Sequence, residues 1–335
     1  MTTVREQLEV YEKEYLSPYA TLSMNSKGRM RKEEPCDIRP VFQRDRDRII
    51  HSKSFRRLKD KTQVFLTPEG DHYRTRLTHT LEVSQNARTI AKALRLNEDL
   101  AEAIALGHDL GHTPFGHAGE RALNRVCPFG FEHNVQSVRT VDLLEKSGLG
   151  LNLTMEVRDG ILNHQTSGKP STLEGKIVRY SDKIAYIHHD MDDAIRGGIL
   201  TEEDIPKEIS QRIGETTGER LNHFIHDLVT NSRGKNDISL SPSVEEAMKM
   251  LRKFMFERVY NNREAKGEEK KAEQLMETLY EYYLSHTEVL PREYQRMMYD
   301  GEKKEQVVCD YVGAMTDRFA IAKYEEIYIP KCWHG

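Results

Sequence analysis

We predict a nearly all-helical fold for this 335-residue chain from two observations. Few segments alternate apolar and polar residues, as half-buried strands do, whereas many repeat apolar residues at helical spacing. Residues that begin or end helices stand at the edges of these segments, with Asn97 at one start and Gly197 and Gly198 at one end. We therefore expect helices joined by loops.

The expected helices follow one another along the chain. Residues 76–96 repeat apolar positions from Leu77 to Leu94, which predicts an amphipathic helix of several turns. The next helix starts at the N-cap Asn97 and should end at Gly111 and Pro114. Further helices are predicted over residues 119–126, 132–148, 171–198, 244–260 and 274–286, and we interpret the charge run at 262–274 as a solvated face or loop.

The composition limits the class of protein. With 37% hydrophobic and 31% charged residues, the chain has a globular rather than a disordered profile. No stretch approaches the ~20 apolar residues of a membrane span, and the N-terminus lacks the apolar core of a signal peptide, so we expect a cytoplasmic protein. The four cysteines show no CxxC spacing, so a bound metal would take nitrogen and oxygen ligands. The net charge of −4 argues against a globally basic nucleic-acid surface.

A first cluster of candidate residues suggests a metal site. His108 and Asp109 are adjacent, and because neighbouring side chains on a helix diverge by about 100°, they can converge on one ion only near a helix end. His79 lies on an earlier helix and Asp182 on a later one. Two imidazoles and two carboxylates form a mixed site suited to Mn, Fe, Ni, Zn or Mg. The alternative is that each residue is separately structural.

A second cluster suggests acid–base chemistry. His117 and Glu120 share one face of the helix that follows the Gly/Pro loop, because their spacing is i, i+3. A carboxylate that orients a histidine and raises its basicity makes a competent general acid. The alternative, a surface ion pair, stays open.

Polar residues also gather around the other candidates. Lys183, Tyr186 and Asp190 share one side of a helix with Asp182, whereas we interpret His188 and His189 as surface or packing residues. Upstream, Arg76 stands one turn before His79 and is the cation we favour for a polyphosphate substrate. The other cations near it are Arg56, Arg57, Lys59, Lys61 and Arg74.

The order His79, His108–Asp109, Asp182 resembles the signature of the HD superfamily of metal-dependent phosphohydrolases. The intervening sequence is similar to the deoxyguanosine triphosphate triphosphohydrolase branch over nearly the whole chain. The segments that carry this resemblance are FQRDRDRIIHSKSFRRLKDKTQVF, YRTRLTHTLEV, GHDLGHTPFGHAGE, GFEHNVQSVR, YSDKIAYIHHDMDDA and DYVGAMTDRFAIAKY.

The resemblance implies one all-helical unit over residues 1–335, with an HD core at about 55–200 and a helical C-terminal extension at about 201–335. It implies hydrolysis of dNTPs, dGTP among them, to deoxynucleoside and inorganic triphosphate by water attack at the α-phosphorus. One divalent metal would be held by the ligands His79, His108, Asp109 and Asp182. It also implies a homo-oligomer, and leaves open an allosteric nucleotide and single-stranded nucleic acid as partners.

The resemblance further implies roles for the surrounding residues. His117 would protonate the departing 5′-oxygen, and Glu120 would orient His117. The positions that match phosphate contacts are Arg76, Lys183 and His133, with His112 bordering the phosphates. Gln63 and Asp190 match contacts to the deoxyribose 3′-hydroxyl, and Tyr186 matches the residue packed under the sugar, where a tight fit rejects ribonucleotides.

Two rival functions remain open at this point. An HD phosphohydrolase could act on another nucleotide, such as a monophosphate, a cyclic nucleotide or an alarmone. Alternatively, the chain could be a nucleotide-binding or single-strand-binding module with little turnover.

Overall fold

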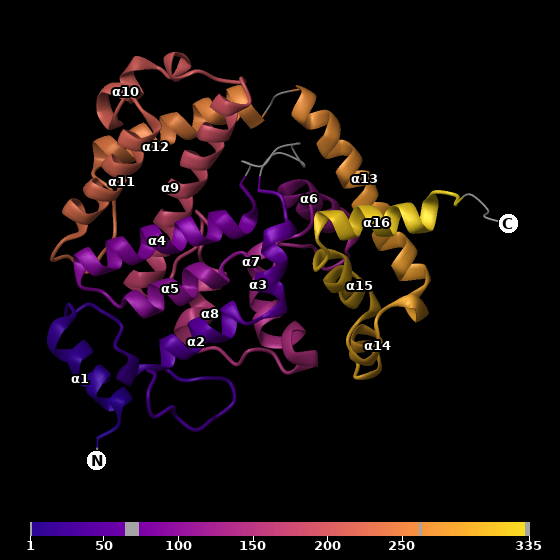
Figure 1. The fold of residues 1–335 in the computed structure, drawn as a ribbon, viewed down its shortest axis with the longest axis horizontal. Coiled ribbons are helices and arrows are strands. Elements are labelled where there is room, and N and C mark those ends of the chain that lie inside the picture. Colours follow the sequence, from indigo (N-terminus) through magenta and orange to yellow (C-terminus); the bar gives the residue numbers. More distant parts are fainter. Residues whose placement is uncertain (1, 64–73, 261–262, 332–335) are drawn as a thin grey trace. The chain divides into compact units, whose positions relative to one another are not determined.

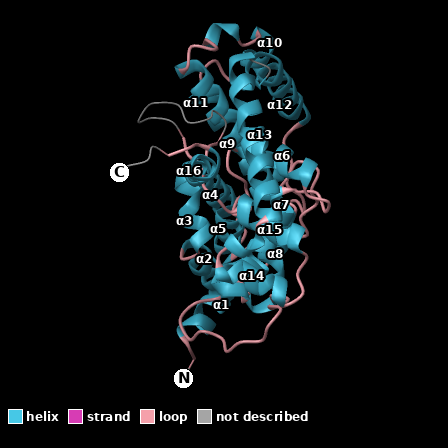
Figure 2. Cartoon of the chain, turned by 90° about the vertical axis from the view of Figure 1, so that its right-hand side faces the viewer, coloured by secondary structure: helices cyan, strands magenta, loops and turns pink. Residues whose placement is uncertain are grey.

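The computed structural model of this chain describes residues 2–63, 74–260 and 263–331. Within these ranges the chain forms helices and loops, with two isolated β-bridges, Arg29 with Thr154 and Thr62 with Thr75, and no strand (Figure 2). The predicted all-α fold class is therefore confirmed. No helix in the described ranges combines the length and apolar character that crossing a lipid bilayer requires.

The chain divides into two compact units, each built from separated stretches of sequence. The first unit comprises residues 1–52, 78–108 and 151–262, and the second comprises residues 53–77, 109–150 and 263–335. Because these stretches alternate along the chain, no linker in the sequence separates the units.

Helices of the first unit surround α5 (Glu98–Gly107), which packs against α2, α8 and α9 (Figure 1). Leu100 and Ile104 of α5 are fully buried, as expected for the apolar row that leads to His108. The other elements of this unit are α1 (Val4–Tyr15), η1 (Ser23–Asn25), α2 (Val41–Ile50), most of α4 (Arg76–Leu94), α8 (Met155–Leu162), α9 (Leu173–Arg196), η5 (Glu202–Asp204), α10 (Lys207–Ile213), α11 (Thr217–Ser232), α12 (Pro242–Met255) and η6 (Phe256–Tyr260).

Two glycines allow α5 and α8 to pack closely. A methyl group added at Gly107 would lie 2.6 Å from Cδ1 of Ile161, and one added at Gly160 would lie 2.5 Å from Cδ1 of Ile104. Contacts this short are repulsive, so only glycine fits at either position without a shift of the neighbouring isoleucine side chain. This close packing fixes the end of α5, where His108 follows.

Capping residues set the ends of the helices that carry the site. The side chain of Asn97 accepts a hydrogen bond from the backbone N–H of Leu100 at 3.1 Å, so the predicted N-cap is confirmed. Thr172 caps α9 in the same way through the N–H of Gly175. As predicted, α9 stops at Gly197 and Gly198, and Gly198 has a φ of +70°.

The second unit packs around α13 (Arg263–Ser285), which contacts α6, α15 and α16. Its core includes Leu123, Met276, Leu279 and Val312, which are fully buried. The other elements of this unit are α3 (Lys53–Arg57), η2 (Leu58–Asp60), α6 (Gly116–Val126), α7 (His133–Arg139), η3 (Thr140–Leu144), η4 (Glu145–Gly148), η7 (Thr287–Val289), α14 (Arg292–Tyr299), α15 (Lys304–Gly313) and α16 (Asp317–Tyr328).

Two segments differ from the sequence predictions, and a third agrees with one of its two predicted alternatives. The helix expected to end at Gly111 ends at Gly107. The helix expected over 132–148 is α-helical only to Arg139, and η3 and η4 follow it, with left-handed backbones at Lys146 (φ of 51°) and Ser147 (φ of 54°). The Glu145 carboxylate accepts the N–H groups of Lys53 and Ser54 at the start of α3. The charge run at 262–274, interpreted as a solvated face or loop, forms part of α13 from Arg263 onward, where Glu268, Lys270 and Lys271 are exposed. Glu269 and Glu273 pair with arginines of α6.

Candidate active site

Three candidate metal ligands meet within the first unit. His79 lies in the first turn of α4, His108 follows the last residue of α5, and Asp182 lies in α9. The Nε2 atoms of His79 and His108 lie 3.1 and 3.8 Å from the same oxygen, Oδ1 of Asp182. Both imidazoles are buried, whereas the Asp182 side chain keeps 26% of its surface exposed. The carboxylate is therefore within reach of a ligand from solvent.

The hydrogen bonding of His108 prepares its ring for a metal. Its Nδ1 atom lies 2.6 Å from the carbonyl oxygen of Ala105, one turn back in α5. Because a carbonyl only accepts, Nδ1 carries the proton and Nε2 presents a lone pair. This is the tautomer that a metal-binding histidine needs.

The charge state of Asp182 also suits a cation. Burial by itself raises the pKa of this carboxyl, but the hydrogen bond with His79 and the neighbouring imidazoles of His108 and His164 outweigh it and lower the pKa to about 2. The group is therefore ionised at neutral pH. Two imidazole nitrogens and an ionised carboxylate form a donor set that fits a divalent metal ion, and Asp109 adds a second carboxylate next to His108 in the chain.

Sequence reasoning missed two histidines beside these ligands. His189, interpreted as a surface or packing residue, is 1% exposed, and its Nδ1 lies 3.3 Å from Nδ1 of His79. The buried His164 ring lies 5.0 Å from the ring of His108, centroid to centroid. His189 follows Asp182 by two helical turns, a spacing that places it on the same face of α9 and could have identified it. No comparable pattern identifies His164.

The first unit also holds three of the candidate substrate residues. Asp190 is fully buried and Tyr186 is half-buried, both on α9. The ammonium group of Lys183 lies 5.7 Å from the ring centroid of Tyr180. Partial burial and the nearby positive charges of Arg252 and Arg179 lower the pKa of Lys183. A group of cations of this kind attracts an anionic ligand.

In the second unit, Asp109 lies between two candidate phosphate contacts. Its Oδ2 accepts a hydrogen bond from the Arg76 guanidinium at 2.6 Å, and its Oδ1 lies 3.5 Å from Nε2 of His112. The ring of His112 stacks on that of His133, with centroids 4.0 Å apart. Asp109, His112 and His133 place ligand atoms within 4.8 Å of one another, a second group with the chemistry of a metal site that sequence reasoning did not single out.

The two stacked imidazoles differ in charge. Burial, reinforced by the positive charge of Arg76, holds the pKa of His112 well below its usual value, so this ring is neutral at pH 7. Burial would also lower the pKa of His133, but the hydrogen bond to the Glu120 carboxylate outweighs it and raises that pKa. The neutral ring of His112 therefore stacks on the ring of His133, whose pKa is raised.

Glu120 accepts hydrogen bonds from two histidines of the second unit. One carboxylate oxygen accepts from Nδ1 of His117 at 3.1 Å, and the other accepts from the backbone N–H and Nδ1 of His133, each at 2.9 Å. Burial opposes ionisation, but these hydrogen bonds prevail and lower the pKa of Glu120. The His117 side chain is 60% exposed, so its other ring nitrogen can reach a bound molecule.

A single buried aspartate of the second unit holds the segments that lead to two candidate residues, His117 and Gln63. Asp317, at the start of α16, accepts hydrogen bonds from the backbone N–H of Phe115 at 3.0 Å and of Thr62 at 2.9 Å. Phe115 has a left-handed backbone, with φ of 61°, which is unusual for a non-glycine residue and is often found at functional sites. The turn at Phe115 leads to His117, and Thr62 leads to Gln63. Among the described residues, the buried Oε1 of Gln63 has no hydrogen-bond partner, nor does Nδ1 of His112.

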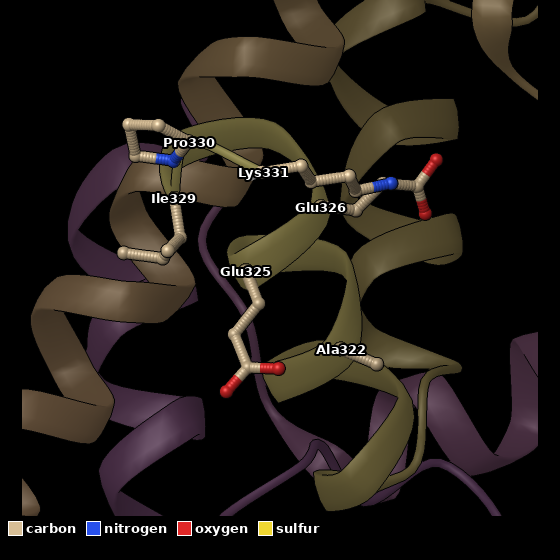
Figure 3. Close-up of a pocket in the computed structure, with 6 residues that line it drawn as sticks. All are labelled: Ala322, Glu325, Glu326, Ile329, Pro330 and Lys331. Carbon is tan, nitrogen blue, oxygen red and sulfur yellow. The ribbon is translucent and has the colours of Figure 1, made fainter. Parts of the chain in front are cut away.

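A hollow of about 460 Å³ lies elsewhere on the second unit, at the end of α16 (Figure 3). It is lined by Ala322, Glu325, Glu326, Ile329, Pro330 and Lys331. None of the candidate site residues lines it, so we assign it no part in the reaction.

Comparison with known proteins defines the class. Residues 76–187 match the HD domain, and residues 238–326 match the phosphohydrolase-associated domain. The HD match contains all four candidate metal ligands. A phosphohydrolase structure from Bacteroides thetaiotaomicron VPI-5482 shares the fold, with a TM-score of 0.52 at 17% identity over 84% of this chain and 67% of that one. Fold and sequence together define an HD-domain phosphohydrolase.

Curated relatives narrow the class to one family. A deoxyguanosinetriphosphate triphosphohydrolase-like protein of Caldanaerobacter subterraneus subsp. tengcongensis is 57% identical over 98% of this chain and 97% of its own length. A protein of the same description from Clostridium perfringens strain SM101 is 51% identical over 98% of both chains. The chain belongs to the deoxyguanosinetriphosphate triphosphohydrolase-like family.

Proposed function

We propose that this protein hydrolyses dNTPs, dGTP among them, to a deoxynucleoside and inorganic triphosphate. In this reaction a water oxygen bonds to the α-phosphorus, the bond from that phosphorus to the 5′-oxygen breaks, and the 5′-oxygen takes up a proton. The observation that carries the proposal is the convergence of His79 and His108 on one oxygen of Asp182, in a chain that belongs to a dGTPase-like family.

The metal ligands we propose are His79, His108, Asp109 and Asp182. Support comes from the ionised Asp182 carboxylate, from the Nδ1-protonated tautomer of His108, and from the place of Asp109 directly after His108. When bound, one divalent ion (Mn, Mg, Fe, Ni or Zn) supplies Lewis-acid stabilisation of the charge that develops on the α-phosphate.

His117 is the proposed general acid. Its Nδ1 donates to Glu120, which fixes the orientation of the ring, so that the opposite nitrogen, Nε2, can give a proton to the departing 5′-oxygen. Without this proton the leaving group would depart as an alkoxide, which is a poor leaving group in water. Glu120 is a positioning residue, because it acts through His117.

Binding of the substrate is divided between phosphate and sugar contacts. We propose Arg76, Lys183, His112 and His133 for the triphosphate. The neutral His112 can donate one hydrogen bond, and the more basic His133 can add a charge. Gln63 and Asp190 are proposed for the 3′-hydroxyl, and Tyr186 for packing under the sugar. The buried Oε1 of Gln63, which no described residue satisfies, supports a ligand contact there.

An assay of the four dNTPs, singly and in pairs, with Mg²⁺ or Mn²⁺, tests the function. We expect tripolyphosphate and deoxynucleoside in equal amounts, and a higher rate in a mixed pair would reveal the allosteric nucleotide that we propose as a partner. Release of orthophosphate or pyrophosphate instead, or turnover of dAMP or ppGpp without turnover of any dNTP, would favour another HD phosphohydrolase activity. Binding of dNTP without any hydrolysis would favour a binding module.

A further inference from the structure

A second pair of residues joins the two helices that carry His79 and Asp182. Glu82 follows His79 by one turn of α4, and His189 follows Asp182 by two turns of α9. The Glu82 carboxylate contacts Nε2 of His189, and Nδ1 of His189 lies 3.3 Å from Nδ1 of His79. The two rings meet edge to face, with planes 84° apart and centroids 5.4 Å apart. A carboxylate and two imidazoles thus form a continuous row of polar contacts that ends at a candidate metal ligand.

The direction of each hydrogen bond in this row follows from the needs of a metal ligand. A metal on Nε2 of His79 requires the ring proton on Nδ1, and that proton needs an acceptor. Nδ1 of His189 accepts it only if the proton of His189 is on Nε2. That proton in turn needs an acceptor, and a carboxylate, which can only accept, is the group in contact with it.

We propose that Glu82 and His189 are positioning residues that hold His79 in its metal-binding tautomer. This proposal rests on the assignment of His79 as a metal ligand in the proposed function. It extends that assignment to two residues outside the ligand set. One of them, His189, lies beyond the end of the HD-domain match at residue 187.

The structure also shows why this role differs from simple packing. His189 is 1% exposed, so its ring fills space in the first unit whatever its tautomer. Although 40% of the Glu82 side chain is exposed, the carboxylate oxygen that contacts His189 is buried. A packing role depends on the shape of His189 alone, whereas a tautomer role depends on an acceptor at position 82.

The affinity for Mn²⁺, measured on the metal-freed full chain from the EPR signal of the free ion, tests the proposal. Glu82→Leu removes the acceptor, and we expect its dissociation constant to rise about 10- to 100-fold, the range for loss of a partner behind a ligating histidine. Glu82→Gln keeps an oxygen that can accept from His189, so it should stay within about threefold of wild type. The matched control is Glu98→Leu, because Glu98 pairs with Arg88 and Lys92 at the surface of the same unit.

Several outcomes would overturn the proposal. Suppose that Glu82→Leu binds Mn²⁺ as tightly as wild type while His79→Ala does not bind it. The positioning role of Glu82 and His189 is then wrong, and His79 remains a metal ligand. If His79→Ala binds Mn²⁺ like wild type, His79 is not a metal ligand, and the positioning role of Glu82 and His189 is wrong as well.

A measurement without variants covers the case in which Glu82→Leu does not fold. Ring ¹⁵N chemical shifts of the Zn²⁺-loaded wild-type protein should show His189 protonated at Nε2 and unprotonated at Nδ1. The reverse tautomer would contradict the proposal.

Discussion

Replacing Glu120 with glutamine tests the acid–base cluster of the second unit. The wild-type carboxylate accepts three hydrogen bonds, one from His117 at 3.1 Å and two from His133 at 2.9 Å. An amide offers one oxygen where the carboxylate offers two, and it carries no charge. The His117 ring would lose the ionised acceptor that fixes its orientation.

The expected loss of activity follows from the share of catalysis that a positioned acid supplies. General acid catalysis contributes about 10²- to 10⁴-fold, so we expect Glu120→Gln to lower kcat for tripolyphosphate release by about 10²-fold or more. The KM should change less, because the candidate phosphate contacts Arg76 and Lys183 are untouched.

The stability of the variant should depend on pH in a characteristic way. The lowered pKa of Glu120 stabilises the fold above the unfolded value of about 4.3, and this contribution is lost as the pH falls through the folded value. The raised pKa of His133 stabilises the fold below about 6.5, and this contribution is lost as the pH rises through its folded value. The deficit of Glu120→Gln should therefore be largest between these limits, at about 1.5–3 kcal/mol.

Urea unfolding at pH 3, 5.5 and 8.5, together with a discontinuous tripolyphosphate assay, measures both effects. A variant that keeps wild-type kcat would remove the His117–Glu120 pair from the mechanism. A stability deficit that is the same at all three pH values would refute the charge argument for His133.

Three further predictions test other parts of the structure. His117→Ala should retain Mn²⁺ and dNTP binding by calorimetry while kcat falls about 10²- to 10⁴-fold, and an unchanged kcat would exclude His117 as the acid. The fully buried Asp310 carboxylate accepts hydrogen bonds from the Arg139 guanidinium at 2.8 and 2.9 Å, and Arg139→Met removes them. This substitution should lower the free energy of unfolding, measured in urea at pH 7.5, by about 3–5 kcal/mol. Because burial already raises the pKa of Asp310, this deficit should shrink at pH 4, and a larger deficit at pH 4 would be a contradiction. Mn²⁺ at 100 times its dissociation constant should stabilise the wild type by about 2.7 kcal/mol in thermal unfolding. The same Mn²⁺ concentration should leave the stability of Asp182→Asn nearly unchanged. Equal stabilisation of both proteins would argue against Asp182 as a ligand.

Local sequence signals predicted the features that depend on local physics. The caps at Asn97 and at Gly197 and Gly198 act over a few residues, so a single segment contains the information. The sequence also suggested that His79, His108 and Asp182 meet at one site, because their order along the chain resembles the HD signature, and the two imidazoles do lie near one Asp182 oxygen in the first unit.

The features that sequence reasoning missed depend on contacts between distant segments. Gly107 packs closely against Ile161 of α8, and the Glu145 carboxylate accepts hydrogen bonds from the start of α3. His189 was interpreted as a surface or packing residue, and its contact with Glu82 joins α9 to α4, so neither segment shows this contact alone. A one-dimensional pattern does not show which helix faces pair, and these three features follow from that pairing.

Hydrolysis of dGTP in H₂¹⁸O by the metal-replete protein, followed by mass spectrometry of both products, tests the central claim most directly. Water attack at the α-phosphorus predicts one ¹⁸O atom in tripolyphosphate and none in deoxyguanosine, with no product after EDTA treatment. Label in deoxyguanosine, labelled orthophosphate in place of tripolyphosphate, or undiminished turnover after EDTA would contradict it.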